Sequence, residues 1–154
     1  YGPNGVAVIV ETLTDNRNRT AGDLRHYFDK FGGNLGTSGS VGWMFDKKGI
    51  IIIQAENGID EDELMEAALD AGADDFVSDD GVFEISTDPD AFHAVRDALD
   101  EKGYSFATCE IQLVPQNYIS LADEHDILMM DKLIEALEDN DDVQNIYHNW
   151  ENVQ

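Results

Sequence analysis

The chain has 154 residues, of which 42% are hydrophobic and 9% aromatic, and this composition is typical of a globular protein rather than a disordered one. Its longest apolar runs are far too short to span a bilayer, so we expect no membrane partner. The formal net charge of −24, taken over the whole chain, argues against nucleic acid as a partner.

The first predicted elements are a strand and a helix separated by a polar loop. Residues 6–13 are almost wholly β-branched and aliphatic, which predicts a central strand buried on both faces. A polar run, residues 14–20, follows directly. Thr20 and Asp23 then form a weak capping box for a helix with apolar residues at helical spacing, and Gly32-Gly33 predicts its end.

Two strands are predicted after the glycines. Residues 41–45 alternate between apolar and small or polar side chains, as in a half-buried strand. Residues 46–49, with the sequence Asp-Lys-Lys-Gly, predict a turn. The turn leads into residues 50–54, whose four consecutive isoleucines indicate a deeply buried strand.

The middle of the chain predicts a ferredoxin-like unit. Asp60 is placed to cap a helix, and Asp80-Gly81 is a strong hairpin signal between two short strands. Asp88-Pro89 starts another helix, and residues 104–114 read as a long strand. From residue 50 onwards the order is therefore βαββαβ, the split βαβ arrangement.

A last helix capped near Asp123 and a terminal strand, residues 143–148, complete the predicted elements. The elements before residue 47 and those after residue 112 each lack partner strands of their own, and we expect them to form a second sheet together. We therefore predict an α+β fold of two α/β sandwich-type domains. A ferredoxin-like domain of residues 47–112 is inserted into a discontinuous α+β domain of residues 1–46 and 113–154.

The basic residues are distributed unevenly. Six of the nine lysines and arginines fall in residues 1–48 with five acids, so this segment carries +1 and the remainder −25. One face of the protein is thus suited to a polyanion that the rest would repel. The alternative is an acidic, solvated protein whose basic residues pair locally.

The polar loop offers the donors that a phosphate needs. Asn16, Arg17, Asn18 and Arg19 supply amide and guanidinium groups within a short span, and an arginine fork binds a phosphate with two hydrogen bonds. The alternative is an Asx-turn loop that only caps its own helix.

Other chemistry is not indicated. The acidic runs fail the EF-hand pattern, and the four histidines show no metal-ligand spacing, so we expect no metal. Cys109 lies in an apolar strand and is expected to be a buried small side chain. No nucleotide-binding or nucleophile motif is present, which predicts neither a cofactor nor an enzyme.

Three motifs resemble a known family. They are residues 11–20 (Glu-Thr-Leu-Thr-Asp-Asn-Arg-Asn-Arg-Thr), Gly32-Gly33-Asn34-Leu35-Gly36, and Gly39-Ser40-Val41-x-x-x-Phe45 with the following Lys47-Lys48-Gly49. They closely resemble the YebC/PmpR family, which includes the mitochondrial translational activator of cytochrome c oxidase subunit I. The resemblance implies three domains, the third inserted in the second. The family's basic helical N-terminal domain has no counterpart in these residues.

The resemblance also implies a function. Family members are described as DNA-binding transcriptional regulators or as ribosome-associated translation factors that relieve stalling. We therefore expect a non-enzymatic, cytoplasmic regulator, or one of the mitochondrial matrix, whose partner is DNA or the ribosome and its RNA. Because the chain starts at Tyr1 in a linker-like run, we expect a piece of something longer.

The residues expected to contact that partner are Asn16, Arg17, Asn18, Arg19, Arg25, Asn34, Lys47 and Lys48. The helix after Thr20 carries few bases, so RNA or ribosome contact is favoured slightly over sequence-specific reading of a duplex. The alternatives are a small-molecule-sensing module of the ACT kind and a protein-docking scaffold. The sequence leaves the oligomeric state open.

Overall fold

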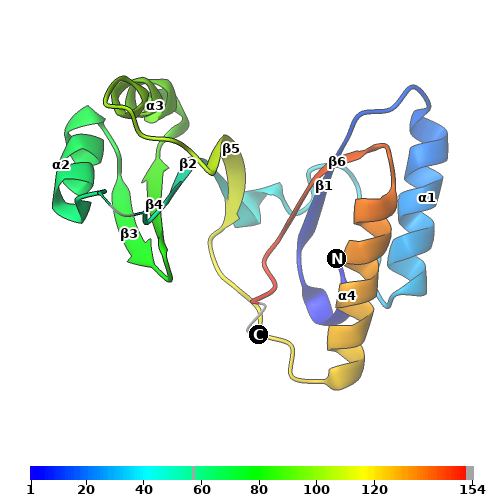
Figure 1. The fold of residues 1–154 in the computed structure, drawn as a ribbon. Coiled ribbons are helices and arrows are strands. Elements are labelled where there is room, and N and C mark those ends of the chain that lie inside the picture. Colours follow the sequence, from blue (N-terminus) through cyan, green and yellow to red (C-terminus); the bar gives the residue numbers. More distant parts are fainter. Residues whose placement is uncertain (57, 152–154) are drawn as a thin grey trace. The chain divides into compact units, whose positions relative to one another are not determined.

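The computed structural model describes residues 1–56 and 58–151 and divides into two compact units. The first unit comprises Tyr1–Asp46 and Val114–Gln154, and the second comprises Lys47–Leu113. Figure 1 shows their elements. Within the described residues, every helix is too short or too polar to cross a membrane.

The first unit is built from two segments that are distant in the sequence. Its regular elements are η1 (Pro3–Gly5), β1 (Val8–Thr12), α1 (Arg17–Lys30), η2 (Gly42–Met44), α4 (Glu124–Asp139) and β6 (Val143–His148). β1 pairs antiparallel with β6, so that Val8 lies opposite His148, and the register shifts between Glu11 and Thr12. The helices α1 and α4 lie side by side against this ribbon (Figure 1).

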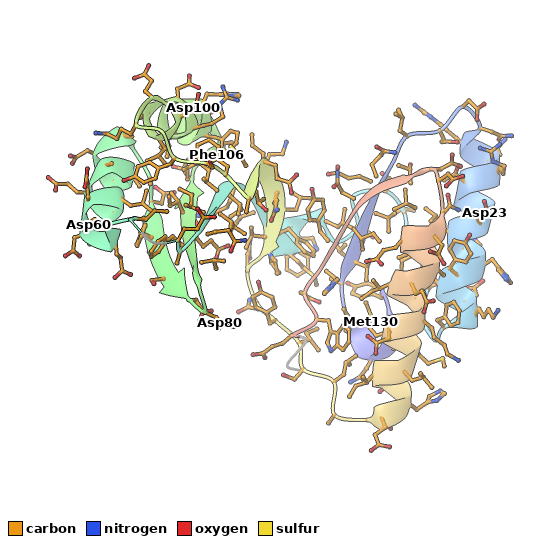
Figure 2. The ribbon with its side chains drawn as sticks, viewed as in Figure 1. Asp23, Asp60, Asp80, Asp100, Phe106 and Met130 are labelled. Atoms are coloured by element: carbon orange, nitrogen blue, oxygen red, sulfur yellow. The ribbon has the colours of Figure 1, made fainter. Side chains whose placement is uncertain are left out.

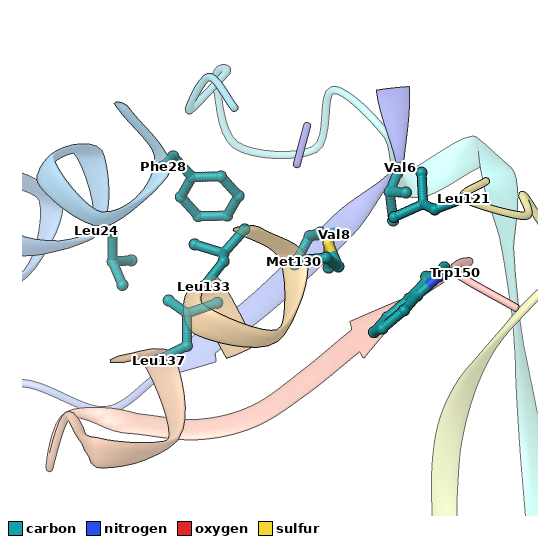
Figure 3. Packing of buried hydrophobic residues seen from close by; sticks show 9 residues of the cluster. All are labelled: Val6, Val8, Leu24, Phe28, Leu121, Met130, Leu133, Leu137 and Trp150. Carbon is teal, nitrogen blue, oxygen red and sulfur yellow. The ribbon is translucent and has the colours of Figure 1, made fainter. Parts of the chain in front are cut away.

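One apolar core holds the first unit together. Apolar side chains of α1 and α4 meet those of β1 and of the segments before α4 and after β6 (Figure 3). The buried members are Val6, Val8, Leu24, Phe28, Leu121, Met130, Leu133, Leu137 and Trp150. The pairing of β1 with β6 and the packing of α1 on α4 both join the start of the chain to its end, so this core depends on both segments.

The second unit has the predicted βαββαβ order. Its elements are β2 (Phe45–Gln54, of which the part from Lys47 lies in this unit), α2 (Glu61–Ala71), β3 (Asp75–Asp79), β4 (Val82–Thr87), η3 (Pro89–Ala91), α3 (Phe92–Glu101) and β5 (Thr108–Pro115, of which the part to Leu113 lies in this unit). The strand order is β3-β4-β2-β5, in which β2 separates the hairpin strands from β5. Asp80 and Gly81 take left-handed φ angles of 43° and 81°, as the tight turn between β3 and β4 requires.

The second core lies between the sheet and the pair of helices α2 and α3, which contact one another. Its buried members are Ile51, Ile53, Leu64, Ala68, Phe83, Ile85, Phe92, Val95 and Leu99. Acidic side chains cover the outside, and Asp60, Asp80 and Asp100 all lie at the exposed surface (Figure 2). The α+β fold class and the ferredoxin-like order are therefore confirmed.

Two local predictions around residue 45 are wrong. Residues 41–45 form a 3₁₀ turn, η2, followed by the first residue of β2, and residues 46–49 continue β2 instead of turning. Gly49 is buried within the strand opposite Thr87. A Cβ atom at Gly49 would overlap the Thr87 hydroxyl and lie 2.5 Å from Phe92 Cδ1. This glycine serves close packing of α3 on the sheet rather than a turn.

The predicted start of α1 and the predicted setting of β1 also need correction. α1 begins at Arg17, so three residues expected in a loop are in the first helical turn. Within the described residues β1 has one partner strand, β6, and is therefore an edge strand rather than a central one. Its burial falls from Val8 to the exposed Thr12, because the core covers only its first half.

Candidate nucleic-acid interface

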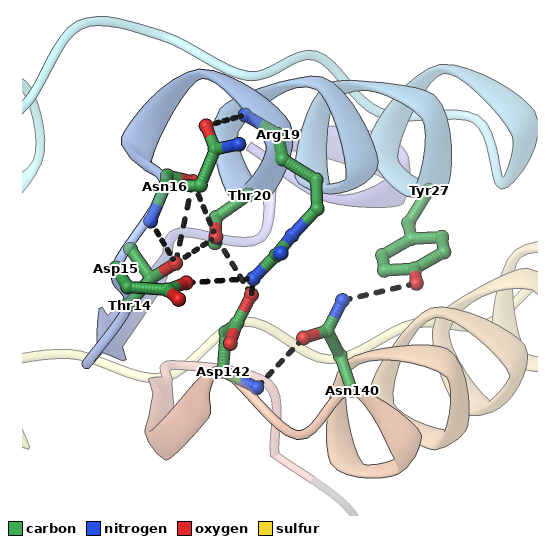
Figure 4. A network of polar contacts seen from close by, with 8 residues as sticks. All are labelled: Thr14, Asp15, Asn16, Arg19, Thr20, Tyr27, Asn140 and Asp142. Atoms are coloured by element: carbon green, nitrogen blue, oxygen red, sulfur yellow. Dashed lines mark hydrogen bonds and ion pairs between the residues drawn. The ribbon is translucent and has the colours of Figure 1, made fainter.

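Asn16 caps the helix that carries most of the predicted contact residues. Its extended backbone precedes α1, and its side-chain Oδ1 accepts a hydrogen bond from the backbone N–H of Arg19 at 3.1 Å (Figure 4). The hydroxyl of Thr14 accepts from the backbone N–H of Asn16 at 3.0 Å. An asparagine at this position satisfies one of the helix's free N–H groups, so the amide of Asn16 is committed to the fold.

Thr20 connects α1 to the turn before β6. It is 3% exposed, and its hydroxyl donates to Asp142 Oδ2 at 2.8 Å while lying 2.8 Å from the Thr14 hydroxyl. Asp142 is itself held in place. Its backbone N–H donates to Asn140 Oδ1 at 2.9 Å, and its carbonyl accepts from the N–H of Leu13 at 2.8 Å. The predicted capping residue is therefore a buried cross-link in the first turn of the helix.

Arg19 completes this network. Its Nη2 lies 3.1 Å from Asp142 Oδ2 and 3.3 Å from Asp15 Oδ1 (Figure 4). Hydrogen bonds from Thr20 and then from Arg19 lower the pKa of the Asp142 carboxyl below its usual value. The same hydrogen bond and charge raise the pKa of Arg19. Because two carboxylates compensate its guanidinium, Arg19 serves first to anchor α1.

Arg17 and Arg25 are the arginines of α1 that have no carboxylate partner in the part of the chain that the structure describes. Both are exposed, and neither has a hydrogen bond or ion pair with another described residue. They are separated by eight residues with Ala21 midway, so all three lie along one stripe of the helix. Asn18, one residue beyond Arg17, is likewise exposed and without a partner among the described residues. These side chains are available to an outside ligand.

A groove runs beside this stripe. One hollow, of about 620 Å³, is lined by β1, the first turns of α1 and the glycine-rich segment, residues 35–38. A second hollow extends along residues 35–42 and shares walls with the first. The shared lining residues are Val10, Leu24, Leu35, Gly36 and Ser38. The two hollows are therefore adjacent, with Arg17 lining the first and Gly42 the second, and we call the pair the α1 groove.

The remaining predicted residues are placed differently. The backbone N–H of Asn34 donates to the carbonyl of Tyr1 at 2.8 Å, and its side chain is exposed next to the α1 groove in sequence. Lys47 and Lys48 lie on β2 in the second unit. The ammonium of Lys48 is 4.0 Å from Asp74. The candidate interface of the first unit is thus Arg17, Asn18, Arg25 and Asn34, supported by Asn16 and Arg19.

Sequence reasoning missed one exposed aromatic residue. The side chain of Trp43 is on η2 and is 69% exposed. The carbonyl of Trp43 accepts a hydrogen bond from Gln116 Nε2 at 3.1 Å, and the backbone N–H of Gln116 donates to the Met44 carbonyl at 2.9 Å. The sequence hid it because the alternation of residues 41–45 predicted Trp43 on the buried face of a strand, whereas the structure places it on a 3₁₀ turn.

Comparison with known proteins gives one consistent result. Residues 1–150 match a family model described as the TACO1/YebC second and third domain. A "Probable transcriptional regulatory protein" of Acetivibrio thermocellus is 59% identical over 150 residues. A protein of the same description from Ruminiclostridium cellulolyticum is 62% identical over 151 residues. These alignments cover 97% and 98% of the chain.

A solved structure agrees with the sequence matches. The crystal structure of a conserved hypothetical protein, Aq1575, from Aquifex aeolicus superposes with a TM-score of 0.84 at 40% sequence identity, covering 98% of the chain. The chain spans 62% of that protein, and 62% and 61% of the two curated relatives. The similarity therefore covers nearly the whole chain but only part of each relative.

Proposed function

The chain belongs to the TACO1/YebC family, and from that premise we propose that it is part of a non-enzymatic regulator of gene expression that contacts nucleic acid through the α1 groove. The relatives' description as probable transcriptional regulatory proteins supports a regulatory role. The proposed contact residues are Arg17, Asn18, Arg25 and Asn34, held in position by Asn16 and Arg19, with Lys47 and Lys48 as additional contacts from the second unit.

The observation that carries the proposal is the pair of uncompensated guanidiniums on one stripe of α1. Acids outnumber bases by 33 to 9 in this chain, yet no described carboxylate lies within ion-pair distance of either arginine. Arg17 lines a hollow that is also lined by Leu35, Gly36 and Ser38 of the glycine-rich segment. Guanidinium forks and backbone N–H groups are the donors that grip phosphates without reading sequence.

The same geometry favours RNA over duplex DNA. A protein that recognises the sequence of duplex DNA commonly inserts a helix with several base-contacting side chains into the major groove. On α1 the cations are Arg17, Arg19, Arg25 and Lys30, and Arg19 is already paired with Asp15 and Asp142. Two free arginines beside an open groove suit the backbone of a single strand or of folded ribosomal RNA better.

Co-sedimentation with ribosomes over a salt series, with a parallel titration of duplex DNA, tests this proposal. We expect the chain to pellet with ribosomes at low salt and to dissociate as salt rises, because phosphate contacts release counterions. We expect the duplex to bind more weakly at equal salt. Tighter binding of the duplex would reverse the choice of partner, and binding of neither at low salt would overturn the proposal.

One observation supports a second candidate, a small-molecule sensor of the ACT kind. The ferredoxin-like second unit has a hollow of about 560 Å³ beside Asp60, Glu63 and Tyr104, with Lys102 at its rim. Burial first, and then the charges of Glu63 and Asp60, raise the pKa of the Tyr104 hydroxyl. A metabolite that raises the melting temperature of the chain in a thermal-shift screen, with no effect of RNA, would favour the sensor.

A further inference from the structure

We propose that Trp43 is a stacking platform for an unpaired nucleobase, so that the ligand of the α1 groove is single-stranded nucleic acid, specifically RNA. This inference rests on the proposed function and names the feature of the ligand that the chain recognises. Its physical basis is the contrast between an unusually exposed ring and an unusually well-held backbone.

The exposure of Trp43 has no structural benefit within the described protein. A tryptophan buries more apolar surface than any other side chain and is normally highly buried in a folded protein. Trp150, the other tryptophan, follows this rule with 5% exposure in the first core. Trp43 is 69% exposed, and it contributes to neither buried core. Its ring face is thus free for a ligand.

The backbone beneath the ring is nevertheless fixed on both sides. Val41 and Phe45, which flank η2, are each 6% exposed. Gln116 holds the turn through its side chain on the Trp43 carbonyl and its N–H on the Met44 carbonyl. A second bond from Gln116 Nε2 reaches Asp46 Oδ1 at 3.2 Å. A ring presented on a backbone ordered beforehand loses little entropy when a planar partner stacks on it.

The surroundings of Trp43 match a nucleotide strand rather than an apolar partner. Gly42, the residue before it, lines the α1 groove, which also contains Arg17. The groove wall from Gly36 to Gly42 carries Thr37, Ser38 and Ser40, whose small hydroxyls are exposed. Trp43 itself lines neither hollow, so the ring stands next to the groove through Gly42. A strand of RNA alternates a charged phosphate and a planar base, which a guanidinium and hydroxyls in the groove and an aromatic face next to it in the chain would bind. A purely apolar partner would leave these donors unsatisfied.

The fluorescence of the two tryptophans allows a direct test. Trp150 is buried and Trp43 is exposed, so acrylamide quenches mainly Trp43 in the free chain. Without acrylamide, single-stranded oligouridine of about ten nucleotides at low salt is expected to quench the emission of Trp43 by stacking on it. With acrylamide, the bound oligouridine is expected to protect Trp43 from the quencher. In the Trp43→Phe variant, where only Trp150 emits, oligouridine is expected to change nothing.

Affinity measurements by a label on the RNA complete the test. We expect Trp43→Ala to weaken oligouridine binding roughly five- to a hundredfold, the range for loss of one stacked base, and Trp43→Phe to restore part of it. The control is Leu128→Ala, which truncates an exposed apolar side chain on α4 (48% exposed) that lines neither hollow of the groove. Leu128→Ala should leave the affinity unchanged.

The outcomes distinguish the stacking role of Trp43 from RNA binding by the α1 groove. Loss of affinity in Trp43→Ala with partial rescue by phenylalanine supports stacking. Unchanged affinity of Trp43→Ala, in a chain that binds RNA and is weakened by Arg17→Ala, overturns the stacking role and leaves the proposed function intact. Failure of the unaltered chain to bind any RNA overturns both.

Discussion

The guanidinium of Arg19 lies 3.1 Å from the carboxylate of Asp142, although the two residues are 123 positions apart in the sequence. Thr20, the residue after Arg19, donates a hydrogen bond to the same carboxylate oxygen. This relationship fastens the first turn of α1 to the turn that precedes β6. It gives the candidate interface a fixed base while it removes one of the arginines from the set that is free to bind phosphate.

The first prediction concerns the buried hydroxyl in this cross-link. Thr20→Val keeps the shape of the side chain but leaves Asp142 without its 2.8 Å donor. We expect the free energy of unfolding to fall by about 1–2 kcal/mol in urea titrations, because a partly buried hydrogen bond is lost. Thr20→Ser, which retains the hydroxyl, is the matched control and should lose clearly less. Equal losses in the two variants would contradict a role for the hydroxyl.

The second prediction is the pH dependence of the Asp142 contribution. The pKa of Asp142 is lowered in the folded state by the hydrogen bonds of Thr20 and Arg19, so its carboxylate stabilises the fold above its ordinary pKa of about 3.9. That contribution disappears as the pH falls through the lower pKa of the folded state. Asp142→Asn should therefore be less stable than the unaltered chain at neutral pH and approach it in acid. A difference that stays constant from neutral pH into acid would show that Asp142 acts through packing alone.

The third prediction addresses Gly49, which the sequence pattern alone places in a turn. A methyl group at Gly49 would overlap the Thr87 hydroxyl and crowd Phe92, so Gly49→Ala should destabilise the chain by about 1–3 kcal/mol. Gly22→Ala is the control, because nothing lies within 4 Å of its added Cβ in the exposed face of α1. It should raise stability slightly through helix propensity. A thermal melt of both variants measures the difference, and a neutral Gly49→Ala would refute the close packing at this site.

The sequence could predict elements whose signals are local. The βαββαβ order follows from the apolar periodicities and from capping and turn residues such as Asp60 and Asp80-Gly81, each of which acts within a few residues. The hairpin at Asp80-Gly81 is an example, since its left-handed turn requires these two residue types. The resemblance of the motifs to the YebC/PmpR family was confirmed by the family match over residues 1–150.

The sequence could not predict features that depend on distant partners. Thr20 resembled a helix cap because its true partner, Asp142, is not adjacent in the chain. Gly49 resembled a turn residue because the crowding by Phe92 appears only when α3 packs on the sheet. Of the residues predicted to bind, Arg17 and Arg25 are free while Arg19 is paired. Asp15, four residues before Arg19, is a local signal of this pairing, but the closer partner, Asp142, is 123 positions away.

The fourth prediction is that the segment of residues 47–113 folds alone. It has its own core and its own sheet, in which the order β3-β4-β2-β5 uses only its own strands. Expressed by itself, it should melt cooperatively in circular dichroism, as a small two-state domain does. Leu99→Ala within it, at a fully buried position, should cost about 2–5 kcal/mol. A non-cooperative melt would show that the segment is not an independent domain.

The salt dependence of RNA binding, compared between the unaltered chain and Arg17→Ala/Arg25→Ala, tests the central claim most directly. The control is Arg96→Ala/Lys102→Ala, which removes the same charge from the second unit. We expect the α1 variant to bind more weakly at every salt concentration and to show a shallower dependence of log affinity on log salt, by about one to two phosphate contacts. The control should keep the slope of the unaltered chain. Equal slopes in all three proteins would contradict the account, because the α1 groove would then not be the surface that meets the phosphates.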